Sequence, residues 1–431
     1  MSGTESSAGS GTESGTESEA DGQLALVRAQ VRPTRPTPPR EPAPELPVAR
    51  VSVDLPLPHL DRPFDYLVPA RMHEACVPGC RVRVRFAGQD RDGYVLDRVA
   101  ESEHGGRLVP LRRVVSSEPV LAPEVARLAR LVADRYAGTR ADVLRLAVPP
   151  RHARVEREDR PEPDPEPRVP AGEVVPGPWE SYDSGRAFLD ALRRGGAPRA
   201  VWTALPGEDW PTCLAVAAAA TLAGGRGVLL VVPDHRDAAR LDAACTVVLG
   251  EGRHLVLTAE LGPAERYRRF LAVRRGHVRC VVGTRAAAFA PVHDLGLVGC
   301  WDDGDDLHAE LRAPYPHVRE VLLLRAHEAG CAAVVGGFGC TAEGAQLMAT
   351  GWARPLTGSR ATVRARAPRV HVAGEGAAEL ARDPAARAVR LPHRAFEIAR
   401  AALATGPVLV QVPRSGYRPS LACQGCRAAA R

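Results

Sequence analysis

The chain has 431 residues and a formal net charge of +6, and all 57 of its basic residues are arginine. The absence of lysine argues against a phosphate-binding loop of the GxxxxGK[ST] type, in which a lysine contacts the β- and γ-phosphates as a compact point charge. The net charge favours a polyanion partner only weakly, because 51 acidic residues accompany the basic ones. A chain of this length has room for two to four domains of roughly 100–200 residues.

Codon bias alone could explain the missing lysine. Asparagine is absent as well, and there is a single isoleucine, as a GC-rich genome would produce. The missing lysine therefore excludes one kind of site without indicating another.

The cysteines favour a reducing, cytoplasmic location. The chain begins without a secretory signal, and its ten cysteines form no dense framework. The longest apolar run, 213–223, is shorter than the ~20 residues needed to cross a bilayer, so no membrane role is expected. Five cysteines in apolar surroundings are interpreted as small core residues: Cys213, Cys245, Cys280, Cys300 and Cys331.

The first part of the chain divides into a tail and a small β domain. Residues 1–45 combine three GTES repeats with an Arg/Pro-rich stretch, which predicts a disordered tail. Residues 46–115 alternate short strands with proline and glycine turns, which predicts a β domain. In the run RVRVRF, Arg81, Arg83 and Arg85 share one strand face. That face is either an ordinary solvated surface or one that contacts phosphates.

The rest of the chain is predicted to contain two helices, a linker and an α/β region. Residues 116–150 predict two helices, typical of a winged-helix-like region or of any small helical appendage. Residues 151–178 are charged and proline-rich, which predicts a linker. Short apolar strands then alternate with helices over 179–360, which predicts a parallel, doubly wound α/β sheet. Residues 361–431 add a helix and one more buried strand, PVLVQV, as the start of a second α/β unit.

From Val48 onward the sequence resembles the bacterial replication-restart PriA family, also called primosomal protein N′. Four strings carry the resemblance in the family's order: PLPHLDRPFDYLVP with RVRVRFAG, VVGTRAAAFAPVHDLGLVG, PYPHVREVLLLRA and RSGYRPSLACQGC. The resemblance implies a domain that binds the 3′ end of a nascent DNA strand, a RecA-like helicase lobe and the beginning of a second lobe.

The sequence departs from the family where nucleotide is expected. The family's GVTGSGKTE is replaced by ALPGEDWPT, which contains Gly207 and places Trp210 at the lysine and Pro211 at the magnesium-binding hydroxyl. Carboxylates beside a phosphate pocket repel the ligand, and proline has no N–H to donate. ATP and Mg²⁺ are therefore not expected to bind in the usual way.

Two further nucleotide-contact strings are also altered. The family's DEEH becomes WDDG, with Trp301 at the magnesium-binding aspartate and Asp302 at the catalytic glutamate. The neighbouring aspartates are interpreted as a solvated acidic loop in preference to a divalent-metal site. GSATPS becomes GGFGCT at 336–341. The sequence thus predicts a helicase fold without phosphoryl-transfer activity, a helicase pseudoenzyme.

Near the end, Cys423 and Cys426 form a CxxC pair, which is half of a tetrahedral zinc site. In the family the other ligands follow further along, so we expect a truncated chain ahead of a metal-free remnant or a redox pair. Zn²⁺ is a candidate cofactor only where further ligands are supplied.

The resemblance implies where DNA would bind. Phe64 and Tyr66 would stack on the terminal base and Asp65 would accept a hydrogen bond from the sugar hydroxyl, whereas without the resemblance both rings are interpreted as core. The arginines of the RVRVRF strand would attract phosphates, and Arg285 of VVGTR would lie on a single-stranded path.

The leading hypothesis is a replication-restart protein that recognises forked DNA, recruits primosome and helicase-loading proteins, and does not unwind DNA. An ATP-dependent 3′–5′ helicase and a scaffold that acts mainly through protein contacts are the alternatives. A nucleoid-associated location follows from the first.

Overall fold

The computed structural model describes residues 41–158, 177–372, 376–411 apart from 385, 387 and 390, and 422–428. The chain divides into two compact units, Met1–Ala365 and Arg366–Arg431. The predicted N-terminal tail lies outside the described residues except for 41–45, where Ala43 is buried and bonds through its N–H to the Val68 carbonyl.

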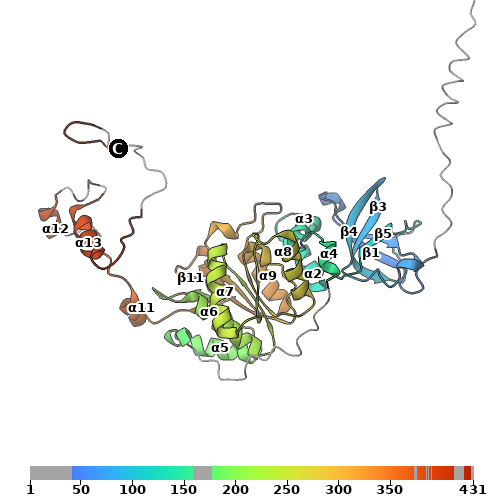
Figure 1. The fold of residues 1–431 in the computed structure, drawn as a ribbon, viewed down its shortest axis with the longest axis horizontal. Helices are drawn as coiled ribbons and strands as arrows, with labels where there is room; N and C mark the ends of the chain where they lie inside the picture. The colour runs from blue at the N-terminus through green and yellow to red at the C-terminus, as the bar shows by residue number, and fades with distance from the viewer. Residues whose placement is uncertain are drawn as a thin grey trace, which may run out of the picture. The chain divides into compact units, whose positions relative to one another are not determined.

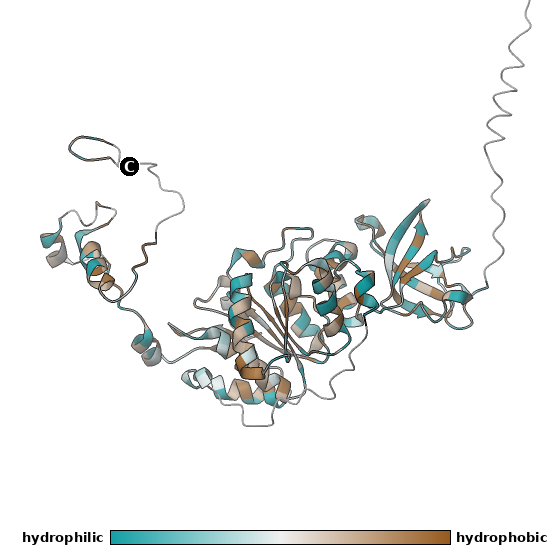
Figure 2. Ribbon diagram, viewed as in Figure 1, coloured by the Kyte–Doolittle hydropathy of each residue, from teal (hydrophilic) through white to brown (hydrophobic). Residues whose placement is uncertain are grey.

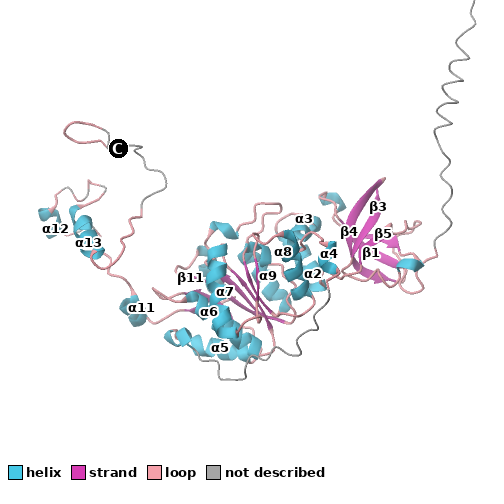
Figure 3. Cartoon of the chain, viewed as in Figure 1, coloured by secondary structure: helices cyan, strands magenta, loops and turns pink. Residues whose placement is uncertain are grey.

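The first described segment folds into an antiparallel sheet with the strand order β2-β1-β4-β3-β5 (Figure 3). Alternating apolar residues build it: Val82 and Val84 of β3 are fully buried, whereas the arginines that alternate with them lie on the other face. This core has its own hydrophobic cluster, separate from those of the parallel sheet. The elements are β1 (Val48–Val53), η1 (Pro58–Leu60), β2 (Phe64–Leu67), η2 (Ala70–Met72), β3 (Arg81–Phe86), β4 (Gln89–Val99) and β5 (Arg113–Ser116).

The helices that follow the sheet pack against the parallel α/β part of the chain. They are α2 (Pro123–Arg135), α3 (Arg140–Ala147) and α4 (Ala153–Glu156). Their apolar faces share one hydrophobic cluster with the lobe, and Arg135 pairs with Glu320 at 2.6 Å. Although residues 151–178 were predicted to be a linker, α4 packs on the lobe because Val155 is buried there. The two helices of 116–150 are confirmed.

A parallel sheet with the strand order β12-β6-β11-β10-β7-β9-β8 forms the larger part of the first unit (Figure 1). This confirms the multidomain α/β class with a RecA-like lobe. The strands are β6 (Arg199–Thr203), β7 (Gly227–Val231), β8 (Leu255–Leu257), β9 (Cys280–Gly283), β10 (Leu295–Trp301), β11 (Ala332–Gly337) and β12 (Arg354–Leu356). The helical elements are η3 (Gly177–Ser181), α5 (Gly185–Arg193), α6 (Trp210–Ala223), α7 (His235–Leu249), α8 (Pro263–Arg274), η4 (Arg285–Ala287), η5 (Asp306–His308), α9 (Val318–Ala329), α10 (Ala342–Ala349) and α11 (Arg360–Arg366).

The two faces of this sheet are buried under different helices. Leu229 and Val298 face a cluster that contains α2, α8 and α9, whereas Leu230 and Leu297 face a cluster that contains α5, α6 and α7. Strands covered on both sides read as continuous apolar runs, and Figure 2 shows these strands in brown. The carboxyl ends of the strands, where the altered strings lie, therefore meet along one edge of a rigid sheet.

The second unit contains helices α12 (Ala377–Arg382) and α13 (His393–Leu403), of which α13 was predicted. The predicted buried strand PVLVQV is wrong over its described residues: 407–411 form no strand, and the side chain of Leu409 is 92% exposed. An apolar run becomes a strand only when a neighbouring strand pairs with it, and the described residues of this unit supply none.

The five cysteines predicted to be small core residues are all buried and unbridged. Within the described residues, no helix combines the length and apolarity required to cross a bilayer.

Candidate nucleotide and nucleic-acid sites

The loop between β6 and α6, where the resemblance places a phosphate-binding loop, is an internally bonded turn. Asp209 caps α6 and accepts hydrogen bonds from the backbone N–H and the hydroxyl of Thr212. Glu208 is 8% exposed and accepts a hydrogen bond from the Tyr182 hydroxyl at 2.8 Å. The helix N-terminus, which commonly binds an anion, is thus occupied by a side-chain carboxylate of its own chain. Gly207 has a φ of +70°, which suits glycine at this turn.

Three aromatic rings meet at the edge formed by this loop, the end of β10 and the residues after β11. Trp210 stacks on Trp301 with ring centroids 4.6 Å apart and planes 11° apart, and Phe338 meets Trp301 edge-on at 5.4 Å. Trp210 and Trp301 are 1% and 3% exposed, whereas Phe338 is 54% exposed. The Arg240 guanidinium lies over the outer face of the Trp210 ring at 5.1 Å.

We call Trp210, Trp301 and Phe338 the aromatic stack. Each ring comes from one of the three strings that depart from the family pattern. The sequence analysis noted the two tryptophans as substitutions but did not predict that the three rings pack together. The presence of an aromatic residue in each of the three strings could have indicated this packing.

The residues after β10 form a buried ion-pair network and not only a solvated loop. Asp303 is 3% exposed and bonds to Arg319 at 3.0 Å and to the Thr341 hydroxyl at 2.8 Å. Arg319, itself 5% exposed, also contacts Glu343 at 3.2 Å. The interpretation as a solvated acidic loop is therefore wrong for Asp303, because an arginine from α9 compensates its charge.

Asp302 has a different environment from its neighbour. It is exposed, has a φ of +51°, and its pKa is raised by partial burial and by the charge of Asp305. Among the described residues, no group of three or more His, Cys, Asp or Glu side chains is placed to hold a metal ion.

We expect Asp303→Asn to lower the free energy of unfolding by about 3 kcal/mol, because it leaves Arg319 buried with too little negative charge. Asp302→Asn is the matched control. Its carboxylate is held at a raised pKa, so the ionised form is disfavoured in the fold, and asparagine tolerates a positive φ. The control should be as stable as the wild type or slightly more so at neutral pH. Urea denaturation measures both, and equal losses in the two variants would contradict the assignment.

The FDY string lies on β2, an edge strand of the antiparallel sheet. Tyr66 is 4% exposed and donates a hydrogen bond to the Arg85 carbonyl at 3.4 Å, and burial raises its pKa to about 12. Its ring is therefore a core ring with no open face for a base, as expected without the resemblance. Phe64 is half-buried, packs edge-on against Phe86, and lies under the Arg62 guanidinium.

Asp65 points to the opposite sheet face from these rings. It accepts a hydrogen bond from the Ser102 hydroxyl at 2.5 Å and lies 3.9 Å from the Arg50 guanidinium. The carboxylate is thereby held in place with 16% of its side chain exposed. Its predicted contact with a sugar hydroxyl stays a prediction.

The arginines of β3 alternate along the strand as predicted, but two of the three are paired with carboxylates. Arg83 forms two hydrogen bonds with Asp92, and Arg85 bonds to Asp90, which are the residues directly opposite on β4. Arg81 donates to the Pro149 carbonyl. The strand face is consequently less cationic than its own sequence suggests, and its contact with phosphates stays a prediction.

Arg285 begins η4 at the carboxyl end of β9. It pairs with Glu310 at 3.0 Å and donates to the carbonyls of Leu307 and Ala309. It therefore holds the loop after β10 in place, a role that sequence reasoning missed.

Cys423 and Cys426 are exposed free thiols in a closed turn, and hydrogen bonds from the backbone of Cys426 and Gly425 lower the pKa of Cys423. Two thiols fit half of a zinc site, and the described residues contribute no other ligand to it.

Residues 50–149 match the family model of the PriA 3′DNA-binding domain (3′BD). A protein of Mycobacterium bovis named "Probable replication restart protein PriA" is 56% identical over 378 residues, which are 88% of this chain and 57% of that protein. The chain is a PriA-like protein. A Mycobacterium leprae protein of the same name is 55% identical over 379 residues, covering 88% of this chain and 58% of the relative. The "Replication restart protein PriA" of Treponema pallidum is 24% identical over 385 residues, covering 85% of this chain and 54% of the relative.

The PriA-like chain spans little more than half the length of these relatives. The match to the 3′BD covers the antiparallel sheet and helices α2 and α3 together. Both the FDY string and the β3 arginines fall inside this match, whereas the aromatic stack and Arg285 lie beyond it.

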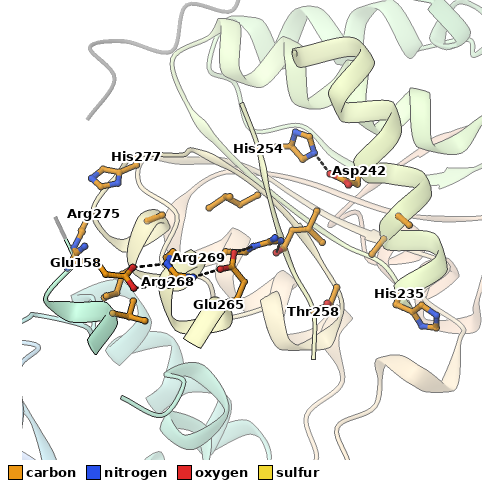
Figure 4. A pocket seen from close by; sticks show the side chains of 17 residues that line it. Glu158, His235, Asp242, His254, Thr258, Glu265, Arg268, Arg269, Arg275 and His277 are labelled. Carbon is orange, nitrogen blue, oxygen red and sulfur yellow. Dashed lines mark hydrogen bonds and ion pairs between the residues drawn. The ribbon is translucent and has the colours of Figure 1, made fainter. Parts of the chain in front are cut away.

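A cavity of about 660 Å³ lies between α7, β8 and α8 of the PriA-like lobe (Figure 4). Several of its charged groups are paired with one another: Arg268 bonds to Glu158 and Glu265, and His254 to Asp242. No sequence pattern indicated this cavity, because its walls come from elements that are separated along the chain.

Proposed function

We propose that this protein is a replication-restart DNA-binding protein that recognises forked DNA through the 3′ end of the nascent strand and acts without ATP-driven unwinding. The match of residues 50–149 to the PriA 3′DNA-binding domain carries the DNA-binding half of the proposal. The aromatic stack carries the other half, because its rings occupy the edge of the sheet where the altered strings converge.

The residues at this edge support the proposed absence of unwinding. A phosphoryl-transfer site needs a cation for the phosphates and carboxylates for Mg²⁺. Here the helix N-terminus is capped by Asp209, and an indole that cannot bind a hard cation ends β10. The lobe then serves as a rigid support for the DNA-binding domain and for primosome and helicase-loading proteins at the nucleoid.

One experiment tests both halves. Fluorescence anisotropy with a fork that has a free leading-strand 3′-OH at its branch is compared with the same fork bearing a 3′-phosphate, and strand separation is followed with ATP. We expect tighter binding to the 3′-OH fork and no unwinding. Unwinding would support an ATP-dependent 3′–5′ helicase instead. Equal, weak binding to both forks would favour a scaffold that acts through protein contacts.

We expect Asp65→Asn to reduce the preference for the 3′-OH fork by about tenfold, because a hydrogen bond to a charged group contributes about 1.5–3 kcal/mol. Asp97→Asn removes an exposed carboxylate from the same sheet and is the control. The ratio of the two fork affinities is the measurement, since a general loss of DNA binding leaves it unchanged. A ratio in Asp65→Asn equal to that of the control would rule out the assigned contact.

A further inference from the structure

Asp61 ties the segment that leads into the FDY string to the two helices that follow the antiparallel sheet. Its carboxylate pairs with the guanidinium of Arg130, which belongs to α2. It also accepts a hydrogen bond from the backbone N–H of Arg140, the first residue of α3, whose nitrogen lies 3.0 and 3.1 Å from the two carboxylate oxygens. The side chain of Asp61 is only 14% exposed. One carboxylate therefore holds both helices to the same point of the sheet.

The two partners of Asp61 both favour a negative charge at this place. The N–H of Arg140 lies at the N-terminal end of α3, where backbone donors lack partners within the helix and the helix dipole is positive. Arg130 adds a charge-assisted hydrogen bond. Arg130 also contacts Asp134 at 2.6 Å, but that carboxylate lies on the same helix and is 61% exposed. Of the two carboxylates that Arg130 contacts, Asp61 is the one that joins α2 to the sheet.

The start of β2 depends on this anchor more than its end does. β2 is an edge strand, and β1 is its neighbour in the sheet. At the end of β2, Leu67 has additional backbone bonds on the outer edge, because its N–H donates to Val109 and its carbonyl accepts from Leu111. Within the part of the chain that the structure describes, no such outer bond reaches Phe64 or Asp65. Support for the start of β2 must come from the residues just before it.

Asp61 lies four residues before Asp65 along the chain, and Pro63 stiffens the connection because its ring fixes φ. Hydrogen bonds weaken steeply when donor and acceptor are misaligned, so a small shift of β2 is enough to disturb a bond made by Asp65. Asp61, Arg130 and Arg140 all fall within the residues that match the 3′DNA-binding domain. The anchor and the FDY string therefore belong to one matched domain.

We propose that Asp61 is a positioning residue for recognition of the 3′ end, which anchors the start of β2 to α2 and α3 and so sets Asp65 against the terminal sugar. The inference rests on the proposed function, in which the FDY string meets the 3′ end of the nascent strand. Asp61 acts through Asp65 and makes no contact with the nucleotide. Helices α2 and α3 thereby contribute to the specificity for the 3′ end through the sheet.

The test compares the full-length chain with its variants Asp61→Asn and Arg130→Gln and with the control Asp134→Asn. The control also removes a carboxylate from Arg130, but it leaves the bond between Arg130 and Asp61 in place. Affinities for the 3′-OH fork and for the 3′-phosphate fork are measured by fluorescence anisotropy, well below the melting temperature of each variant. Melting temperatures are recorded for all of them.

We expect Asp61→Asn and Arg130→Gln each to reduce the ratio of 3′-OH to 3′-phosphate fork affinity about fivefold, the loss of one ordinary hydrogen bond, with the affinity for the 3′-phosphate fork unchanged. The double variant should lose no more than either single variant, because both break the same link. Adding Asp61→Asn to Asp65→Asn should leave the ratio of Asp65→Asn as it is. An aspartate that only stabilises the fold would lower the melting temperature and keep the wild-type ratio.

Other results would overturn the inference. A wild-type ratio in both Asp61→Asn and Arg130→Gln would do so and leave the proposed function standing, as would an equal loss in Asp134→Asn or an equal weakening of both forks. If Asp61→Asn does not fold, Arg130→Gln decides, since it keeps the bond from Asp61 to the start of α3. Equal affinity of the wild type for the two forks would contradict the proposed function itself and, with it, the role of Asp61.

Discussion

Millimolar ATP with Mg²⁺ is expected to leave the melting temperature of this protein unchanged, and forked DNA is expected to stimulate no ATP hydrolysis. The reason is the way the edge of the sheet is filled. Trp210 and Trp301 stack in contact, and the N-terminus of α6 is capped by Asp209. A phosphate entering there would meet carboxylate oxygens and apolar rings in place of N–H donors and a cation.

The size of the expected difference makes this test decisive. A site saturated at a hundred times its dissociation constant adds about 2.7 kcal/mol to the free energy of unfolding, a shift that thermal denaturation resolves easily. ADP and a non-hydrolysable analogue serve as parallel ligands, because a site that binds without turnover would respond to them. A saturable rise in melting temperature with any of the three would show that the aromatic stack yields to nucleotide, and hydrolysis that increases with DNA would show a working motor.

The period of the apolar residues predicted the fold well, because it reflects burial that is local to each strand. The alternation in RVRVRF places Val82 and Val84 in the core, and the continuous apolar strands of 179–360 form a sheet that is covered on both faces. The prediction of a strand for PVLVQV was wrong although its pattern is also apolar. A strand needs a neighbouring strand to pair with, and the apolar pattern of one segment does not show whether such a neighbour exists.

The charges of the candidate sites were much less predictable, because they depend on pairing between distant residues. The β3 arginines look cationic along the chain, whereas the register of β3 with β4 sets Arg83 opposite Asp92. Asp302 and Asp303 are neighbours with the same side chain, yet only Asp303 meets an arginine from α9.

The aromatic stack could be predicted in part from the sequence. The sequence showed Trp210 and Trp301 at positions where the resemblance places nucleotide-contacting residues. That the two rings pack against each other depends on the parallel order of the strands, which brings the loop after β6 beside the end of β10. The aromatic residues of three separate strings thus form one packed cluster, in which the two tryptophans are buried and Phe338 is half exposed.

Trp301→Ala is expected to lower the free energy of unfolding by about 4 kcal/mol, the usual loss when a fully buried aromatic ring is truncated in a core. Trp301 contacts rings on both sides, with Trp202 at 5.2 Å and Trp210 at 4.6 Å, so its removal leaves a cavity that its neighbours cannot close. Phe338→Ala is the matched control within the same stack. Its ring is half exposed, and we expect a loss of about 1 kcal/mol. Urea denaturation followed by circular dichroism measures both.

The variant Trp301→Ala also tests whether the lobe only supports the DNA-binding domain or takes part in recognising the 3′ end. The antiparallel sheet has its own hydrophobic cluster, to which Phe64 and Tyr66 of the FDY string contribute, so Trp301→Ala should keep the 3′-OH preference at temperatures well below its melting point. Fork binding is therefore measured at low temperature on Trp301→Ala and Phe338→Ala together. If Trp301→Ala unfolds no more easily than Phe338→Ala, the stack is not a packed core feature. If it stays folded but loses the 3′-OH preference, the lobe does more than support the DNA-binding domain, and recognition of the 3′ end requires the edge of the sheet that the stack fills.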